Sequence, residues 1–226
     1  MQNGTPSNFN PSEAATPILD GAFEVPNEEK ISNIAEHFKA ILEELGLDVE
    51  DESLRDTPER VARMYVNEIF SGLDPHNKPE VTLFENKYGY DRMLLQKNIS
   101  LFSFCEHHFL PIVGKAHVAY FSEGKIAGLS KLNRIVNYYA RRPQVQERLT
   151  RQIALDLRQT LQTNHVAVIV EARHMCVSAR GIQDVESQTF SSQYLGKFNE
   201  EAVRNEFLQY LSLSSTQEPP EPGQKP

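Results

Sequence analysis

Apolar residues recur every three or four positions in two stretches near the start of the chain. Over 28–45 this spacing indicates one face of an amphipathic helix, and Gly46 supplies a stop signal directly after it. In the second stretch a polar capping residue precedes Pro58, and proline suits the first turn of a helix. We therefore expect a pair of N-terminal helices, the second over 58–71.

The middle of the chain changes to the pattern of strands, after a mostly extended connection. Apolar and aromatic residues over 99–104 and again over 113–121 predict a hairpin-like pair. The β-branched run at 166–170 is short and uniformly apolar, as in a buried strand. A last strand is expected over about 187–198.

Helical spacing also returns between these strands. One helix is expected to start at Ser130 and another at Pro143, where apolar residues are four apart, and a third covers 200–213. Strands interrupted by a pair of helices are typical of an α+β fold, here an antiparallel sheet with the helical pair on one face.

Composition adds limits to this picture. The chain has 226 residues, 39% of them hydrophobic, and a formal charge of -8, which fits a soluble globular protein and argues against binding nucleic acid over its whole surface. Polar residues with Pro and Ser dominate 1–27 and 214–226, so we expect flexible tails around one ordered domain, 28–213. No signal region or apolar run of about 18 residues occurs, so a cytoplasmic protein without a membrane segment is expected.

Candidate chemistry gathers in two short clusters. Three of the seven histidines and both cysteines fall in Cys105-Glu106-His107-His108 and His174-Met175-Cys176. Thiolate and imidazole are zinc ligands, and a catalytic zinc site uses three protein ligands and leaves one position open. Each cluster follows a predicted strand, so adjacent strands could bring the two together. A single cysteine is more often a small core residue, but that alternative does not explain two clusters.

The choice of ligands within the clusters is less defined. In a strand, His174 and Cys176 would point to the same face. A turn in the first cluster would let Cys105 and His108 converge, which would leave His107 for acid/base work. A closed structural site would need a fourth ligand, and either His107 or His174 could supply it.

A basic stretch follows at 131–158, with seven bases against two acids. Arginine forks and the N-terminus of the helix expected at Ser130 suit phosphate oxygens, although scattered arginines on solvated helix faces would look the same. Arg180, four residues after Cys176, is better placed to serve the metal site.

The two clusters, together with GKAHVAY, GLSKLNRIV, ARRPQVQERLTRQIA and EARHMCVSARGI, closely resemble GTP cyclohydrolase I from about residue 31 to residue 198. This resemblance implies the tunnelling fold, in which subunits join into a toroidal oligomer, a homodecamer of two pentamers. It implies an enzyme that converts GTP and water into 7,8-dihydroneopterin triphosphate and formate, the entry to folate-type pterins, with one zinc ion per subunit. The first 27 residues match nothing in the family pattern.

The resemblance also assigns roles to residues. Zinc is expected to activate the water that attacks C8 of guanine, and His174 to protonate the neighbouring ring nitrogen. Arg60 and Arg63 are expected near the phosphates across a subunit boundary. The other residues of the set are the zinc ligands Cys105, His108 and Cys176; the catalytic residues His107, His174 and Ser130; Gln146 and Glu147 for guanine; and Lys131, Arg134 and Arg180 for the triphosphate.

Three other functions are weighed against this one. A nitrile reductase of the same fold would use one cysteine and no zinc, so this alternative does not explain the other residues of the two clusters. A zinc or pterin-binding module without turnover would have no need of His107, His174 and Ser130. A zinc nucleobase deaminase would carry His-x-Glu and Pro-Cys-x-x-Cys, which are absent here.

Overall fold

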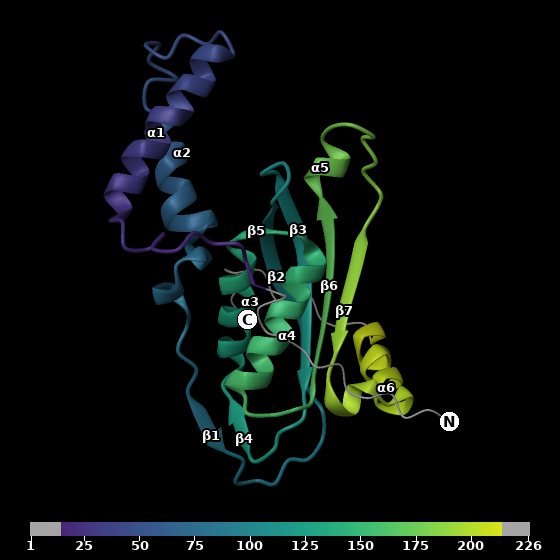
Figure 1. Cartoon of the computed structure of the whole chain (residues 1–226). Helices are drawn as coiled ribbons and strands as arrows, with labels where there is room; N and C mark the ends of the chain where they lie inside the picture. Colours follow the sequence, from purple (N-terminus) through teal and green to yellow (C-terminus); the bar gives the residue numbers. More distant parts are fainter. Residues whose placement is uncertain (1–14, 214–226) are drawn as a thin grey trace, which may run out of the picture.

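The protein is described by a computed structural model that places residues 15–213. An N-terminal arm of two packed helices projects from the body (Figure 1). It consists of α1 (Asn27–Glu44) and α2 (Thr57–Met64), and a π-helical turn, Tyr65–Ile69, extends α2. Both helices expected from the periodicity are thus confirmed, the second with a change of helix type after Met64.

The arm is attached to the body at Gly72. This residue donates its N–H to the carbonyl of Arg141 at 2.9 Å, and a Cβ at this position would collide with the carbonyl oxygen of Tyr138. Only glycine lets the two backbones approach so closely. The position expected to end the second helix is therefore also the contact that holds the arm.

The body is built on a five-stranded sheet of order β5-β2-β3-β6-β7, antiparallel except for the short parallel pairing of β5 with β2. A separate two-stranded sheet pairs β1 with β4. The strands are β1 (Leu83–Glu85), β2 (Leu94–Cys105), β3 (Pro111–Tyr120), β4 (Lys125–Ala127), β5 (Pro143–Gln144), β6 (Val166–His174) and β7 (Thr189–Tyr194).

The strand register brings the ends of β2 and β6 to the same end of the sheet. Phe104 near the end of β2 pairs with Pro111, and Ile112 pairs with His174 at the end of β6. The last residues of β2 and β6 therefore lie on either side of the start of β3. The expected neighbourhood of the two clusters is confirmed, and the hairpin of β2 with β3 is what produces it.

Two helices cover one face of the sheet, as expected: α3 (Leu129–Ala140) and α4 (Gln146–Thr160) (Figure 1). The expectation that the second helix starts at Pro143 is wrong. Pro143 and Gln144 pair with β2, and Val145 is extended, so the helix begins at Gln146. Fully buried aliphatic side chains join both helices to the sheet, among them Leu101, Ile112, Ile135, Leu149, Ile153 and Val168.

A smaller core lies on the opposite face of the sheet. There α6 (Glu201–Ser212) and the preceding turn pack Phe207 and Phe198 against Ala119 and Ala167. The last strand is shorter than the expected 187–198, because the chain enters a 3-10 turn at Gly196–Asn199. None of the helices over 15–213 combines the length and apolar character needed to cross a membrane.

The two expected tails fall mainly on residues 1–14 and 214–226, which lie outside the described residues. Within the described part of the first, Thr16 accepts hydrogen bonds from Arg142 and Gln152, at 3.2 and 3.1 Å. This segment therefore contacts the helical layer.

Candidate metal centre and active site

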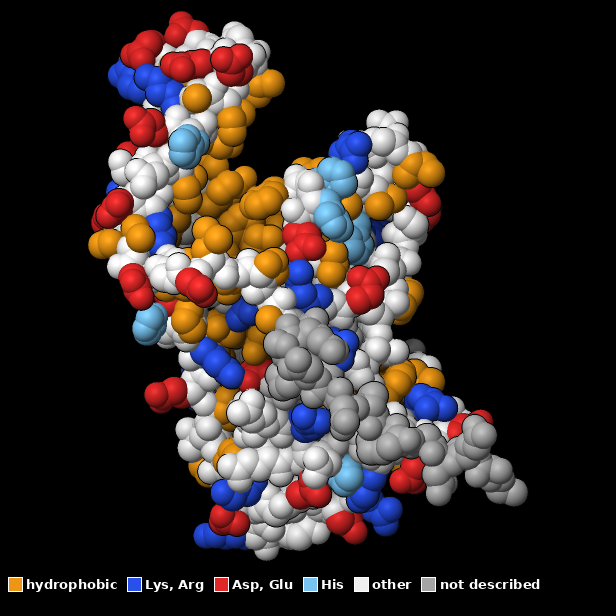
Figure 2. Space-filling view, in the orientation of Figure 1, with side chains coloured by type: hydrophobic (Ala, Val, Ile, Leu, Met, Phe, Trp, Pro, Cys, Tyr) orange, Lys and Arg blue, Asp and Glu red, His pale blue; other side chains and the backbone are white. Residues whose placement is uncertain are grey.

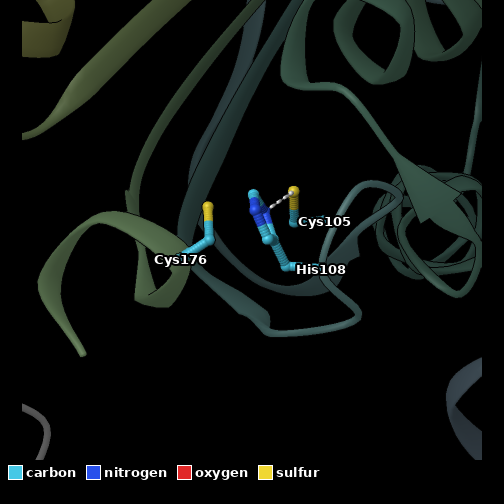
Figure 3. A group of neighbouring side chains, drawn as sticks. All are labelled: Cys105, His108 and Cys176. Atoms are coloured by element: carbon cyan, nitrogen blue, oxygen red, sulfur yellow. Dashed lines mark hydrogen bonds between the residues drawn. The ribbon is translucent and has the colours of Figure 1, made fainter. Parts of the chain in front are cut away.

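Three side chains converge at the end of the sheet. The Sγ atoms of Cys105 and Cys176 and a ring nitrogen of His108 all lie within 4.8 Å of one another. Cys105 is the last residue of β2, His108 lies in the turn that follows, and Cys176 comes from the short helix α5 (Met175–Ser178) (Figure 3). Two thiols and one imidazole form a donor set that suits a transition metal, and zinc in particular.

The turn that carries His108 is held by its own backbone. The backbone of Cys105 makes two hydrogen bonds of 2.8 Å to the end of the turn. Its N–H donates to the carbonyl of Leu110, and its carbonyl accepts from the N–H of Phe109. Phe109 has a positive φ of 54°, which reverses the chain within a few residues. The predicted convergence of Cys105 and His108 is therefore present. His107 lies close as well, with Nδ1 3.8 Å from the Cys105 sulfur, but it is not one of the three converging groups.

Cys176 reaches the site by a route that the sequence analysis missed. His174 and Cys176 were expected on one face of a strand, but β6 ends at His174 and Cys176 lies in α5. The helical turn closes with the N–H of Ala179 on the carbonyl of Met175, at 2.9 Å. Burial raises the pKa of the Cys176 thiol, and the adjacent Cys105 raises it further. A metal ion must therefore displace a proton to bind this sulfur.

Arg180 lies against the same group. Its Nη1 atom is 3.1 Å from Nε2 of His108. A guanidinium only donates, and a neutral imidazole has one lone pair, so this contact and metal ligation by His108 exclude each other. Metal binding would free the Arg180 guanidinium for another acceptor, such as a phosphate oxygen.

The first turn of α4 faces His174. Nε2 of His174 lies 2.8 Å from Oε1 of the buried Gln146, and the next residue, Glu147, is exposed. Burial lowers the pKa of His174, and the Glu147 carboxylate acts in the opposite direction. A half-buried imidazole beside an exposed carboxylate can exchange protons with a ligand bound between α4 and α5.

An ion pair that the sequence analysis did not identify ties α4 to the metal-ligand turn. Arg148 pairs with Glu106 and also donates to Gln144 Oε1 and to the carbonyl of Pro143, at 3.0 and 2.9 Å. Glu106 in turn donates its backbone N–H to the carbonyl of Gln144 at 3.0 Å. Both charges are visible in the sequence, but no local spacing links residues 42 positions apart.

The remaining predicted site residues lie elsewhere in the chain. Ser130 and Lys131 are in the first turn of α3, next to β4 and far from α5 (Figure 1). Arg134 lines a separate cavity with Gly72 and Asn77. One chain therefore brings Cys105, His107, His108, Gln146, Glu147, His174, Cys176 and Arg180 together, but not Ser130, Lys131 or Arg134.

The arginines of the arm already have partners. Arg60 pairs with Asp56 at 2.9 Å, and Arg63 pairs with Glu59 at 2.8 Å and with Glu28 at 3.5 Å. These pairs are exposed to solvent, so they contribute little to stability and can be exchanged for other acceptors.

Comparisons with known proteins agree on one family. Its model, described as GTP cyclohydrolase I, matches residues 34–212. The GTP cyclohydrolase 1 of Flavobacterium johnsoniae is 50% identical over 90% of this chain and 92% of its own length. That of Aeromonas hydrophila is 52% identical over 85% of this chain and 88% of its own.

Among solved structures, the archaeosine synthase QueF-Like in the apo form aligns with 46% of this chain and 93% of its own length, at 14% identity and a TM-score of 0.39. A likeness this low supports no argument about fold or function.

Proposed function

Because the chain belongs to the GTP cyclohydrolase I family, we propose that it hydrolyses GTP to 7,8-dihydroneopterin triphosphate and formate, with the catalytic domain at 28–213. The observation that carries this proposal is the convergence of Cys105, His108 and Cys176 within 4.8 Å, beside His174 and Glu147. A metal site with an adjacent acid/base histidine is the arrangement that hydrolysis of an unactivated ring carbon needs.

Zinc is the metal that best fits this donor set. Two cysteines and a histidine make three protein ligands, which is the number found in catalytic zinc sites. When bound, zinc would supply Lewis-acid activation of water at near-neutral pH. One ion is expected per chain, because only one such group of three occurs in the part of the chain that the structure describes.

The side chains around this group account for the rest of the reaction. Glu147, exposed at the start of α4, would accept hydrogen bonds from the N–H groups of guanine, so that adenine would leave it unpaired. His174 would give a proton to the ring nitrogen next to C8 as that ring opens and C8 leaves as formate. His107 would serve the later proton transfers that accompany rearrangement of the ribose.

The triphosphate needs residues that one chain does not bring to its own metal group. Arg180 is in place, but Ser130, Lys131 and Arg134 lie on α3, and Arg60 and Arg63 lie on the arm. We therefore infer that the complete site forms between copies of the chain, as in the toroidal decamer of two pentamers that the family resemblance implies.

Exposed apolar surface supports this assembly. Hydrophobic side chains line the inner side of the arm and the adjoining part of the body (Figure 2). Leu45 is 70% exposed, and Ile41 and Phe109 are about half exposed. An apolar surface of this kind is typical of a subunit interface.

The fate of C8 tests the proposed activity. GTP labelled with ¹³C at C8 should yield labelled formate when incubated with the zinc-loaded protein, whereas C8-labelled ATP should yield none. Release of phosphate from GTP without labelled formate would instead indicate a nucleotide phosphatase and would refute the proposal.

A further inference from the structure

Every polar atom of the Gln146 side chain is bonded within the protein. The residue is 1% exposed. Its amide nitrogen donates to the carbonyl of Val170 on β6, at 3.1 Å, and to the carbonyl of Thr189 on β7, at 2.9 Å. Its Oε1 atom is 2.8 Å from Nε2 of His174. The side chain is therefore placed to act on the histidine, and its polar atoms are not free to read a guanine.

This network determines which way the amide points. Two carbonyl oxygens can only accept, so the NH₂ group must face them, and Oε1 must face the imidazole. Since Oε1 is also an acceptor, Nε2 of His174 must carry the hydrogen. In the neutral ring the lone pair is then on Nδ1, which has no hydrogen-bond partner among residues 15–213.

We propose that Gln146 is a positioning residue that fixes both the orientation and the tautomer of His174, so that Nδ1 is the atom that takes up a proton and, once protonated, gives it to the substrate, while Nε2 keeps its own hydrogen. The inference rests on the proposed function only in giving His174 a catalytic role. With this role, the Gln146 side chain does not bind the guanine base, contrary to what the family resemblance had led us to expect.

The anchor of this interaction is rigid. Gln146 is the first residue of α4, and its two carbonyl partners belong to neighbouring strands of the sheet. A hydrogen bond to the second nitrogen commonly sets the tautomer of a functional histidine. Here helix and sheet together hold the acceptor, so the ring cannot rotate without leaving buried polar groups unpaired.

Gln146→Met tests the proposal, because methionine has a similar size and makes none of the three bonds. The matched control is Thr150→Val, one turn along α4. Thr150 is equally buried and bonds to Ser191 on β7 at 2.6 Å and to the backbone carbonyl of Gln146 at 2.9 Å, but its hydroxyl makes no hydrogen bond to His174 or to the Gln146 side chain. In Gln146→Met we expect kcat to fall by roughly 100-fold, while KM for GTP and the bound zinc stay unchanged. In Thr150→Val we expect kcat to stay at the wild-type value.

A raised KM with unchanged kcat would show that Gln146 reads the base after all, and equal losses in both variants would reduce its role to packing. Each result would overturn the proposal.

The tautomer can be measured without turnover. In protein labelled with ¹⁵N-histidine, the His174 signals, assigned by their loss in His174→Gln, should show a protonated Nε2 and an unprotonated Nδ1 at pH 8, and the preference should weaken in Gln146→Met. A protonated Nδ1 in the wild-type chain would refute the proposal. This readout holds even if GTP is not the substrate, so failure of the two proposals can be told apart.

Discussion

His174 and Cys176 are two positions apart, yet we expect them to have different tasks. Cys176 points to Cys105 and His108, whereas His174 bonds to Gln146. Cys176→Ala should therefore lose the metal, and His174→Ala should keep it while turnover falls by about 10²–10⁴-fold. Metal content per chain, measured by mass spectrometry after dialysis, separates the two effects. One zinc ion per chain in Cys176→Ala would contradict the ligand assignment.

His117 gives a prediction for stability against pH. It is 7% exposed on β3, accepts the N–H of Asn98 at 3.3 Å, and lies 3.5 Å from Glu171. Burial lowers the pKa of His117, Lys115 and Lys97 lower it further, and Glu171 acts in the opposite direction. The unfolded chain therefore takes up a proton first, so stability should fall as pH drops through about 6.5, the usual histidine value.

Urea unfolding at pH 7.5 and pH 5.5 checks this effect. His117→Gln should lose less stability between the two pH values than the wild-type chain does, while replacement of the exposed His37 by Gln should leave the difference unchanged. Parallel losses in wild type and His117→Gln would show that other groups control acid unfolding.

Residue types and spacing were enough to locate a candidate metal site in the two clusters, because few residues bind zinc and they cluster. The choice of Cys105, His108 and Cys176 within the clusters came from the family resemblance, and these three are the groups that converge in the structure. The turn that joins Cys105 to His108 followed from a spacing of three. The partners of Gln146 could not be predicted in this way, since Val170 and Thr189 act through backbone carbonyls that carry no sequence signal.

At the scale of elements, the first turn of α4 supports both halves of the site. Arg148 holds Glu106 in the metal-ligand turn, and both side chains are largely buried. Arg148→Met would leave Glu106 without its partner and should cost roughly 1–3 kcal/mol of stability, and it should also weaken zinc binding.

Thermal unfolding and zinc titration against a competing chelator measure these two effects. The control is Lys39→Met, which removes an exposed cation 3.6 Å from Glu50 and should cost less than about 1 kcal/mol. Zinc affinity equal to wild type in Arg148→Met would show that the turn holds its shape without α4.

Most helices and strands were predictable from apolar periodicity, and the errors have physical causes. Pro143 suits the start of a helix, but the chain first pairs with β2, and tertiary pairing outweighed this local preference. The strand at 166–170 extends to His174 because β3 continues alongside it, a fact about the neighbouring strand. Cys176 leaves the strand for α5, which is too short to show a helical period.

At the scale of the whole molecule, we propose that residues of one copy complete the site of another. Copies carrying Cys176→Ala should lack the metal, and copies carrying Lys131→Ala should lack the proposed triphosphate contact. In mixed oligomers, some sites should combine an intact metal group with an intact Lys131. If the two variants mix at random in equal amounts, about one site in four has an intact metal group on one copy and an intact Lys131 on its neighbour. The mixture should therefore regain about a quarter of wild-type activity.

The measurement compares the mixture, after dissociation and reassembly, with each variant alone. A mixture no more active than its components, although sizing shows mixed oligomers, would contradict a shared site. Such an assembly could not be derived from the periodicity of one chain, because the residues proposed to meet across copies share no element.

The most direct test of the central claim is a paired count of products from GTP. Formate and the pterin, the latter as fluorescence after oxidation and dephosphorylation, should appear in equal amounts with zinc-loaded protein. Both should vanish after chelation and return when zinc is added back. Absence of both products from fully zinc-loaded protein, or unchanged yields after complete metal removal, would contradict the account of a zinc-dependent GTP cyclohydrolase.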